Sequence, residues 1–88
     1  MKIKDGYLLS EVAGTTVVVP VDPAHTFRGM LKLNGTGTLL WERLATDAEE
    51  SELVALLVSE YEIDGATAAR DVDAFLTMLR GFGVLEEA

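Results

Sequence analysis

An 88-residue chain with no cysteine and a formal net charge of −8 excludes several classes of protein at the outset. Without cysteine, the chain has no disulfide framework, thiolate metal site or cysteine nucleophile, and this composition fits a reducing compartment. Fifteen acidic residues against seven basic ones oppose nucleic-acid binding, because that binding neutralises phosphates with Lys and Arg.

The length and hydrophobicity predict a single domain over residues 1–88. A composition of 49% hydrophobic and 25% charged residues is typical of globular proteins. A chain of this size buries roughly 60–65% of its unfolded surface, which is enough for a core without a metal. The residues before Tyr7 include lysines but no apolar stretch, and no apolar run is long enough to cross a bilayer. We therefore expect a cytoplasmic protein that does not contact a membrane.

The first part of the chain has the character of β-strands. Residues 7–13 and 15–21 are rich in β-formers and flank Ala13-Gly14, a turn in which Gly tolerates positive φ. Pro20 cannot donate a ladder hydrogen bond, so we expect it to face outward or to end its strand. After a polar loop, residues 27–33 form a third strand. The prediction is a three-stranded antiparallel meander.

From Asn34 onward the apolar residues take helical spacing. The Asn34 side chain is expected to cap a helix over residues 35–46. Asp47 begins an Asp-x-x-Glu sequence, which predicts a capping box for a second helix over residues 48–61.

A third helix is predicted over residues 65–81. Asp64 caps its start, and Gly81 and Gly83 can end it. The residues expected on inward helix faces are Leu40, Trp41, Leu44, Leu53, Leu56, Leu57, Tyr61, Ala68, Val72, Phe75, Leu76, Leu79 and Phe82, with Val84 and Leu85 packing back on the core. Three strands followed by three helices predict an α+β domain of winged-helix-like architecture.

No motif indicates catalysis. Gly35-Thr36-Gly37-Thr38 lacks the Lys of a phosphate-binding loop, so we interpret its small residues as allowing close packing against the sheet. His25, in the polar loop, lacks the partners of a general base or metal ligand. Asp71 and Asp73, at i and i+2, point to different helix faces. We expect a non-catalytic protein with no cofactor and no metal.

Three motifs in this chain have a distinctive order and spacing. They are Met30-Leu31-Lys32-Leu33-Asn34-x-Thr36-Gly37-x-x-Leu40-Trp41-x-x-Leu44, then Glu52-Leu53-Val54 with Tyr61, then Asp71-Val72-x-x-Phe75-Leu76-x-x-Leu79 with Gly83-Val84-Leu85. Together they resemble the PqqD family over residues 6–86. The resemblance implies a recognition element for ribosomally made, modified peptides. Its members hold the leader segment of a precursor peptide as an added strand beside the 27–33 strand, against the 65–81 helix, and present it to a modifying enzyme, often a radical SAM protein.

The basic residues favour the same two elements. Arg28 and Lys32 lie on the 27–33 strand, and Arg70 and Arg80 lie on the 65–81 helix. We therefore expect a ligand with acidic residues near its apolar anchors. Strand addition draws affinity from main-chain hydrogen bonds at a free edge. The predicted peptide-binding residues are Arg28, Gly29, Met30, Leu31, Lys32, Leu33, Arg70, Asp71, Ala74, Phe75, Met78 and Leu79.

Several alternatives stay open from the sequence. A Lys on an edge strand also prevents unwanted strand pairing, and Arg70 can pair with Asp73. The fold permits a winged-helix DNA-binding regulator, although a helix with Asp71 and Asp73 is not uniformly basic. A homodimeric scaffold subunit joined through the third-strand edge is also open, and we expect a monomer or a weak homodimer. Core filling is the competing interpretation for Leu31, Phe75 and Leu79.

Overall fold

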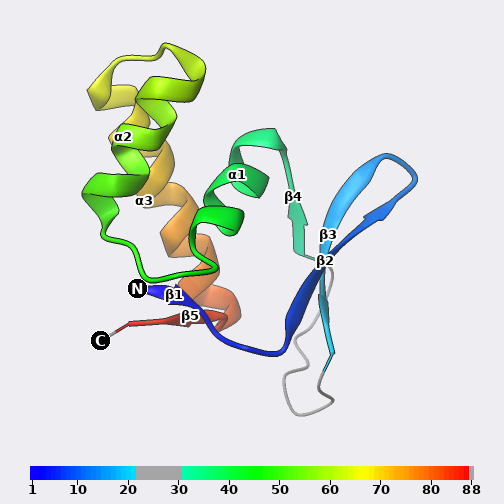
Figure 1. Ribbon diagram of the computed structural model, residues 1–88. Helices are drawn as coiled ribbons and strands as arrows, with labels where there is room; N and C mark the ends of the chain where they lie inside the picture. The colour runs from blue at the N-terminus through cyan, green and yellow to red at the C-terminus, as the bar shows by residue number, and fades with distance from the viewer. Residues whose placement is uncertain (22–30, 88) are drawn as a thin grey trace.

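Two antiparallel sheets and three helices form the part of the chain that the computed structural model describes, residues 1–21 and 31–87 (Figure 1). The larger sheet has the order β2-β3-β4, made of β2 (Tyr7–Val12), β3 (Thr15–Pro20) and β4 (Leu31–Leu33). The helices are α1 (Gly35–Arg43), α2 (Glu50–Tyr61) and α3 (Gly65–Phe82). This arrangement confirms the predicted α+β fold of three antiparallel strands followed by three helices.

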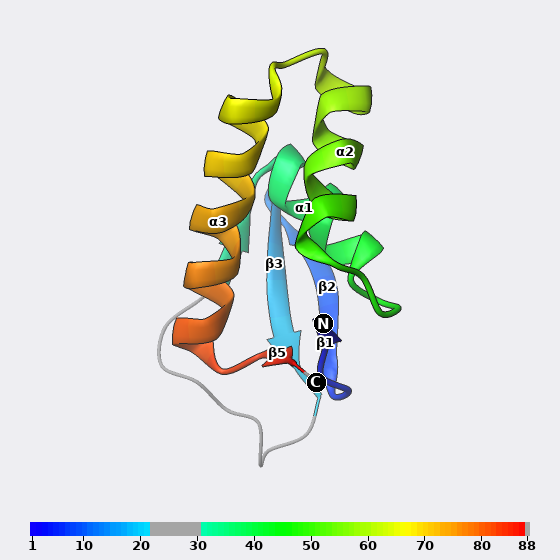
Figure 2. The same ribbon diagram turned by 90° about the vertical axis from the view of Figure 1, so that its left-hand side faces the viewer.

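The helices cover one face of the larger sheet. Figure 2 shows α2 and α3 side by side, with β2 and β3 behind them. Val18, Leu31 and Leu33 point from this face into a core completed by Leu40, Leu57 and other helix residues. The opposite face carries Leu8, Val12 and Val19, which are 57%, 54% and 40% exposed.

The β2–β3 hairpin turns at Ala13 and Gly14, as predicted. Val12 pairs with Thr15, and the two turn residues have φ values of +51° and +81°. Positive φ at both central positions matches the right-handed twist of the strands, but Ala has a Cβ that disfavours it. Pro20 ends β3. The hairpin projects beyond the helices (Figure 1).

The predicted third strand is described only from Leu31. Leu31, Lys32 and Leu33 are buried, exposed and buried in turn, which is the alternation of a strand with one covered face. The predicted site residues Arg28, Gly29 and Met30 lie outside the described residues, as does His25.

Local capping fixes the start of α1. The Asn34 Oδ1 atom accepts a hydrogen bond of 2.7 Å from the Gly37 amide, as predicted. The helix ends at Arg43 rather than at residue 46. The Ala45 amide donates to the Glu42 carbonyl, at the i−3 spacing of a tightened turn that leaves the α-helix.

The predicted capping box at Asp47 is wrong. Helix α2 begins at Glu50, with Glu49 as its N-cap, and the Glu52 side chain accepts from the Glu49 amide at 3.3 Å. Asp47 instead accepts a 2.7 Å hydrogen bond from the N-terminal ammonium group of Met1. That bond lowers the pKa of the Asp47 carboxyl group. A long-range contact therefore replaces the local one that the sequence suggested.

Helix α3 is capped at both ends as expected. Asp64 Oδ1 accepts from the Thr67 amide at 2.7 Å, and this bond lowers the pKa of Asp64. Gly83, with φ of +71°, ends the helix in the left-handed region. Tyr61, predicted in the core, is 45% exposed, so that prediction is wrong.

Val84 and Leu85 are buried, which confirms their predicted packing. The sequence did not indicate the small sheet that they help to build, in which β1 (Lys2–Ile3) pairs with β5 (Leu85–Glu86). This sheet brings the described chain ends together (Figure 1). None of the helices described here has the length and apolar character to cross a membrane.

The Asp64 cap should make the stability of α3 depend on pH. The folded-state pKa of Asp64 lies below its ordinary value of 3.8. Its contribution is therefore complete above that value and is lost as pH falls through the lowered folded-state pKa. We expect Asp64→Ala to unfold at lower urea than the wild type at neutral pH, and the difference to shrink in acid. Asp64→Asn, which keeps a capping oxygen, should stay close to the wild type at neutral pH. An equal loss in both variants would contradict this role.

The positive φ at Ala13 predicts a stabilising substitution. Ala13→Asn places a residue that tolerates left-handed backbone beside Gly14. We expect the free energy of unfolding to rise by about 0.5–1 kcal/mol, since the left-handed conformation disfavours Ala by about 1–2 kcal/mol. Urea denaturation measures the change. Ala69→Asn, on the exposed surface of α3, is the matched control and should lower stability by about 0.6 kcal/mol. The prediction fails if Ala13→Asn also destabilises the protein.

Candidate functional site

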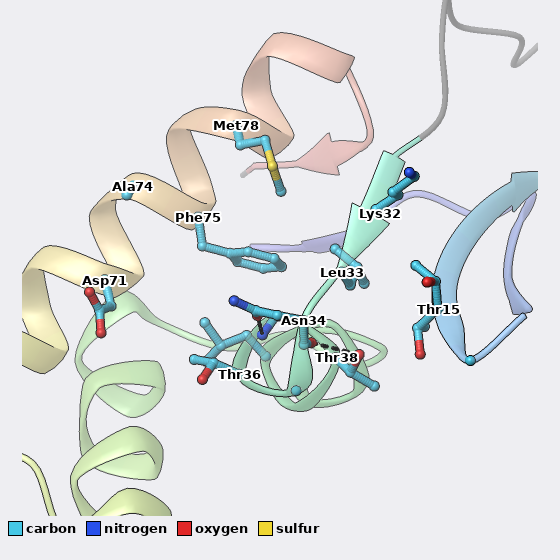
Figure 3. A pocket seen from close by; sticks show the side chains of 15 residues that line it. Thr15, Lys32, Leu33, Asn34, Thr36, Thr38, Asp71, Ala74, Phe75 and Met78 are labelled. Atoms are coloured by element: carbon cyan, nitrogen blue, oxygen red, sulfur yellow. Dashed lines mark hydrogen bonds between the residues drawn. The ribbon is translucent and has the colours of Figure 1, made fainter. Parts of the chain in front are cut away.

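A groove of about 1000 Å³ lies between β4 and α3, beside the first turn of α1 (Figure 3). Three segments line it: the turn and start of β3, the junction from β4 into α1, and one face of α3. The lining residues are Gly14, Thr15, Thr16, Lys32, Leu33, Asn34, Gly35, Thr36, Gly37, Thr38, Leu40, Asp71, Ala74, Phe75 and Met78.

One stripe of α3 forms the helical wall. Asp71, Ala74, Phe75 and Met78 are spaced at i, i+3, i+4 and i+7, which places them on one helix face. The aromatic and thioether side chains are half-buried, whereas Asp71 and Ala74 are exposed. In Figure 3 the Phe75 ring points from α3 toward Leu33. The wall is therefore apolar in the middle and acidic at the end that carries Asp71.

The first turn of α1 contacts this wall closely. A Cβ atom at Gly37 would lie 3.2 Å from Cε1 of Phe75, 3.2 Å from Oδ1 of Asn34 and 3.6 Å from Cβ of Leu33. The same atom at Gly35 would meet only the Tyr61 hydroxyl, at 3.7 Å. The close packing inferred for the Gly-Thr-Gly-Thr sequence is therefore present at position 37, where a side chain would oblige its neighbours to shift.

Strand β4 lies at one edge of the larger sheet. On one side it pairs with β3, with Leu33 opposite Thr16 and Lys32 opposite Val17. In an antiparallel ladder, alternate residues direct their N–H and C=O groups toward the partner strand and the others away from it. Within residues 1–21 and 31–87, no strand pairs with the other side of β4. Its outward main-chain groups are therefore available for a further strand.

The charges of the groove differ from the sequence-based expectation. Lys32 is exposed, and no ion pair involves it among the described residues. Arg80, in contrast, is already paired with an anion of this chain, because its Nε and Nη2 atoms donate to Glu87 Oε1 at 3.0 and 2.7 Å. This interaction raises the pKa of Arg80 and lowers that of Glu87. Arg70 is exposed on α3 but does not line the groove.

Half of the predicted site residues come together in the groove. Those that line it are Lys32, Leu33, Asp71, Ala74, Phe75 and Met78. Leu31 and Leu79 are 2% and 0% exposed and belong to the core, which agrees with core filling for these two residues. Phe75, for which core filling was also considered, lines the groove and packs against the core.

Two parts of the groove were missed from the sequence. Thr15 and Thr16 join it through the register in which β3 pairs with β4, and no local sequence pattern indicates that register. The residues around Asn34 were recognised only as a helix start. Their position directly after an edge strand could have indicated the site, because a helix that follows such a strand lies next to any groove along it. The described residues contain no group of three or more His, Cys, Asp or Glu side chains able to hold a metal.

Two solved structures resemble this fold. The first is described as TbiB1 in complex with the TbiA(beta) leader peptide; it has a TM-score of 0.76 and 25% identity, with 100% of this chain and 98% of that chain covered. The second, a lasso peptide synthetase B1 complexed with the leader peptide, has a TM-score of 0.73, 22% identity and coverage of 98% and 96%, and it supports the fold alone. A comparison with curated proteins gave no match. The family described as Coenzyme PQQ synthesis protein D (PqqD) matches residues 15–85, and this protein therefore belongs to the PqqD family.

Proposed function

We propose that this protein is a non-catalytic peptide-recognition domain for a ribosomally made precursor peptide. It binds the leader segment as a strand added to β4 and holds it against α3. A modifying enzyme, such as a radical SAM protein, then acts on the core segment in the cytoplasm. The observation that carries the proposal is the edge of β4, with which no strand in residues 1–21 or 31–87 pairs, beside a groove with an apolar helical wall.

The chemistry of the groove suits an extended peptide. Main-chain groups of β4 supply hydrogen bonds that any sequence can use, and pockets for alternate side chains supply specificity. Phe75 and Met78 offer a half-buried apolar surface, and Met adapts its shape to varied ligand side chains. Membership of the PqqD family and the leader peptide named in the first similar structure support this assignment.

The charge distribution supports a peptide more than DNA. The groove wall of α3 carries Asp71, and Arg80 of the same helix is paired with Glu87. A recognition helix that neutralises phosphates needs available cations instead. Pairing of two copies through β4 uses the same edge as a bound strand, so the two compete for it.

Filling the groove should abolish peptide binding without unfolding the protein. Ala74 is exposed on the groove wall, so Ala74→Arg adds bulk where the ligand lies. We expect affinity for a leader peptide that the wild type binds to fall by at least roughly ten-fold, a loss of about 1.4 kcal/mol. Isothermal titration calorimetry measures it. Ala69→Arg, exposed on α3 but outside the groove, is the matched control and should bind like the wild type. Equal affinity in both variants would place the ligand elsewhere.

Strand addition predicts a dependence on alternate peptide amides. N-methylation of every second residue removes N–H donors on one side of an extended ligand. In the register whose methyl groups face β4, two lost hydrogen bonds should weaken binding by about 1–3 kcal/mol. The opposite register should bind like the unmodified peptide, because its methyl groups face away from β4. A helix or an irregular ligand would lose affinity in both registers, and that result would contradict an added strand.

A further inference from the structure

We infer that Lys32 selects the bound peptide for one acidic side chain, at the position that pairs with it across the sheet edge, between two apolar residues. The inference rests on the proposed function and assigns a sequence preference to it. It arises from the burial pattern of β4, the pairing register and the charges on the two sides of the groove.

The alternation of β4 separates two kinds of position on an added strand. Leu31 and Leu33 are 2% and 6% exposed and face the core, whereas Lys32 faces the opposite side. Directly paired residues of neighbouring strands share a face of the sheet. A ligand residue opposite Lys32 therefore lies on the outer face beside the ammonium group. Its two chain neighbours lie on the inner face.

The inner positions favour apolar side chains. They face the same side as Leu33, toward which the Phe75 ring points, with Met78 beside it (Figure 3). Asp71 stands at the end of this wall and adds a negative charge to the groove. An acidic ligand side chain at an inner position would meet apolar surface and a like charge. Acidic residues are therefore disfavoured there and are restricted to the outer face.

The outer face offers Lys32 no anion from the strands beside it. The row of directly paired residues across the sheet runs from Ser10 through Val17 to Lys32. The diagonal neighbours of Lys32 on β3 are Thr15 and Val19, which are also uncharged. Figure 3 shows the Lys32 side chain pointing away from Phe75 at the rim of the groove. Among residues 1–21 and 31–87, no strand lies on the other side of Lys32, so an added strand would place an acidic side chain opposite it.

A different role for Lys32 makes a different prediction. A lysine that only prevents edge-to-edge association would repel other strands without preferring any ligand sequence. Replacing it with Glu would then leave the selected peptides unchanged. A selecting Lys32 requires the preference to reverse with the sign of the charge.

The test is a selection from a displayed library of random peptides of about 12 residues, which extend over roughly 40 Å as a strand. The wild type, Lys32→Glu and Lys4→Glu are used in parallel. Lys4 is exposed and does not line the groove, so its variant carries the same change of net charge. Circular dichroism checks that all three proteins are folded.

We expect the wild type and Lys4→Glu to enrich Asp or Glu at one position flanked by apolar residues, and Lys32→Glu to enrich Lys or Arg there. Synthetic peptides that differ only at this position should show a preference of about five-fold, reversed in Lys32→Glu. The preference should weaken with added salt, because both charges are exposed. Apolar enrichment without a charge preference, or one unchanged in Lys32→Glu, overturns the inference and leaves the proposed function standing. Enrichment of no peptide by the wild type overturns both.

Discussion

The first turn of α1 packs directly against the Phe75 ring, which forms part of the groove wall. Gly37 has no side chain, and this allows the helix start to lie very close to the ring. A Cβ atom added at this position would be only 3.2 Å from Cε1 of Phe75. The same turn follows β4 directly, and Asn34 fixes the change of direction by accepting from the Gly37 amide. Strand, helix start and helical wall are therefore coupled through one residue. A side chain at position 37 would have to displace the Phe75 ring or the Asn34 side chain, and both belong to the lining of the groove.

The groove divides its work between backbone and side chains. In the proposed complex, the backbone of β4 forms hydrogen bonds that do not depend on ligand sequence. The α3 stripe selects ligand side chains by their shape and apolar character. Lys32 and Asp71 place opposite charges on the outer and inner sides of the groove.

Features that depend on neighbouring residues could be predicted from the sequence. The Asn34 and Asp64 caps each need only a side chain and an amide three residues later, and both are present. The Asp47 cap failed because a distant partner, the N-terminal ammonium group, takes that carboxylate. The β1–β5 sheet could not be predicted, since its strands have two residues each and lie at opposite ends of the chain. Tyr61 likewise has the spacing of an inward-facing residue, but it is the last residue of α2 and is 45% exposed.

The same distinction between local and long-range features holds for the candidate site. Helical spacing alone places Asp71, Ala74, Phe75 and Met78 on one face, but burial then decides that Leu79 belongs to the core. The pairing of Arg80 with Glu87 depends on how the chain turns after Gly83, beyond any periodic pattern. The residues of the hairpin enter through register, which no local signal fixes.

The position of β4 at the sheet edge has a consequence for how a bound peptide is displayed. An added strand does not close the sheet; it moves the edge outward by one strand spacing, about 4.8 Å. The ligand itself then becomes the outermost strand. Half of its main-chain groups are used against β4, and the other half remain unpaired on the far side. In the proposed complex, the ligand segment thus becomes a straight strand in a fixed register. The sheet of the protein then sets the direction in which the peptide chain leaves the groove.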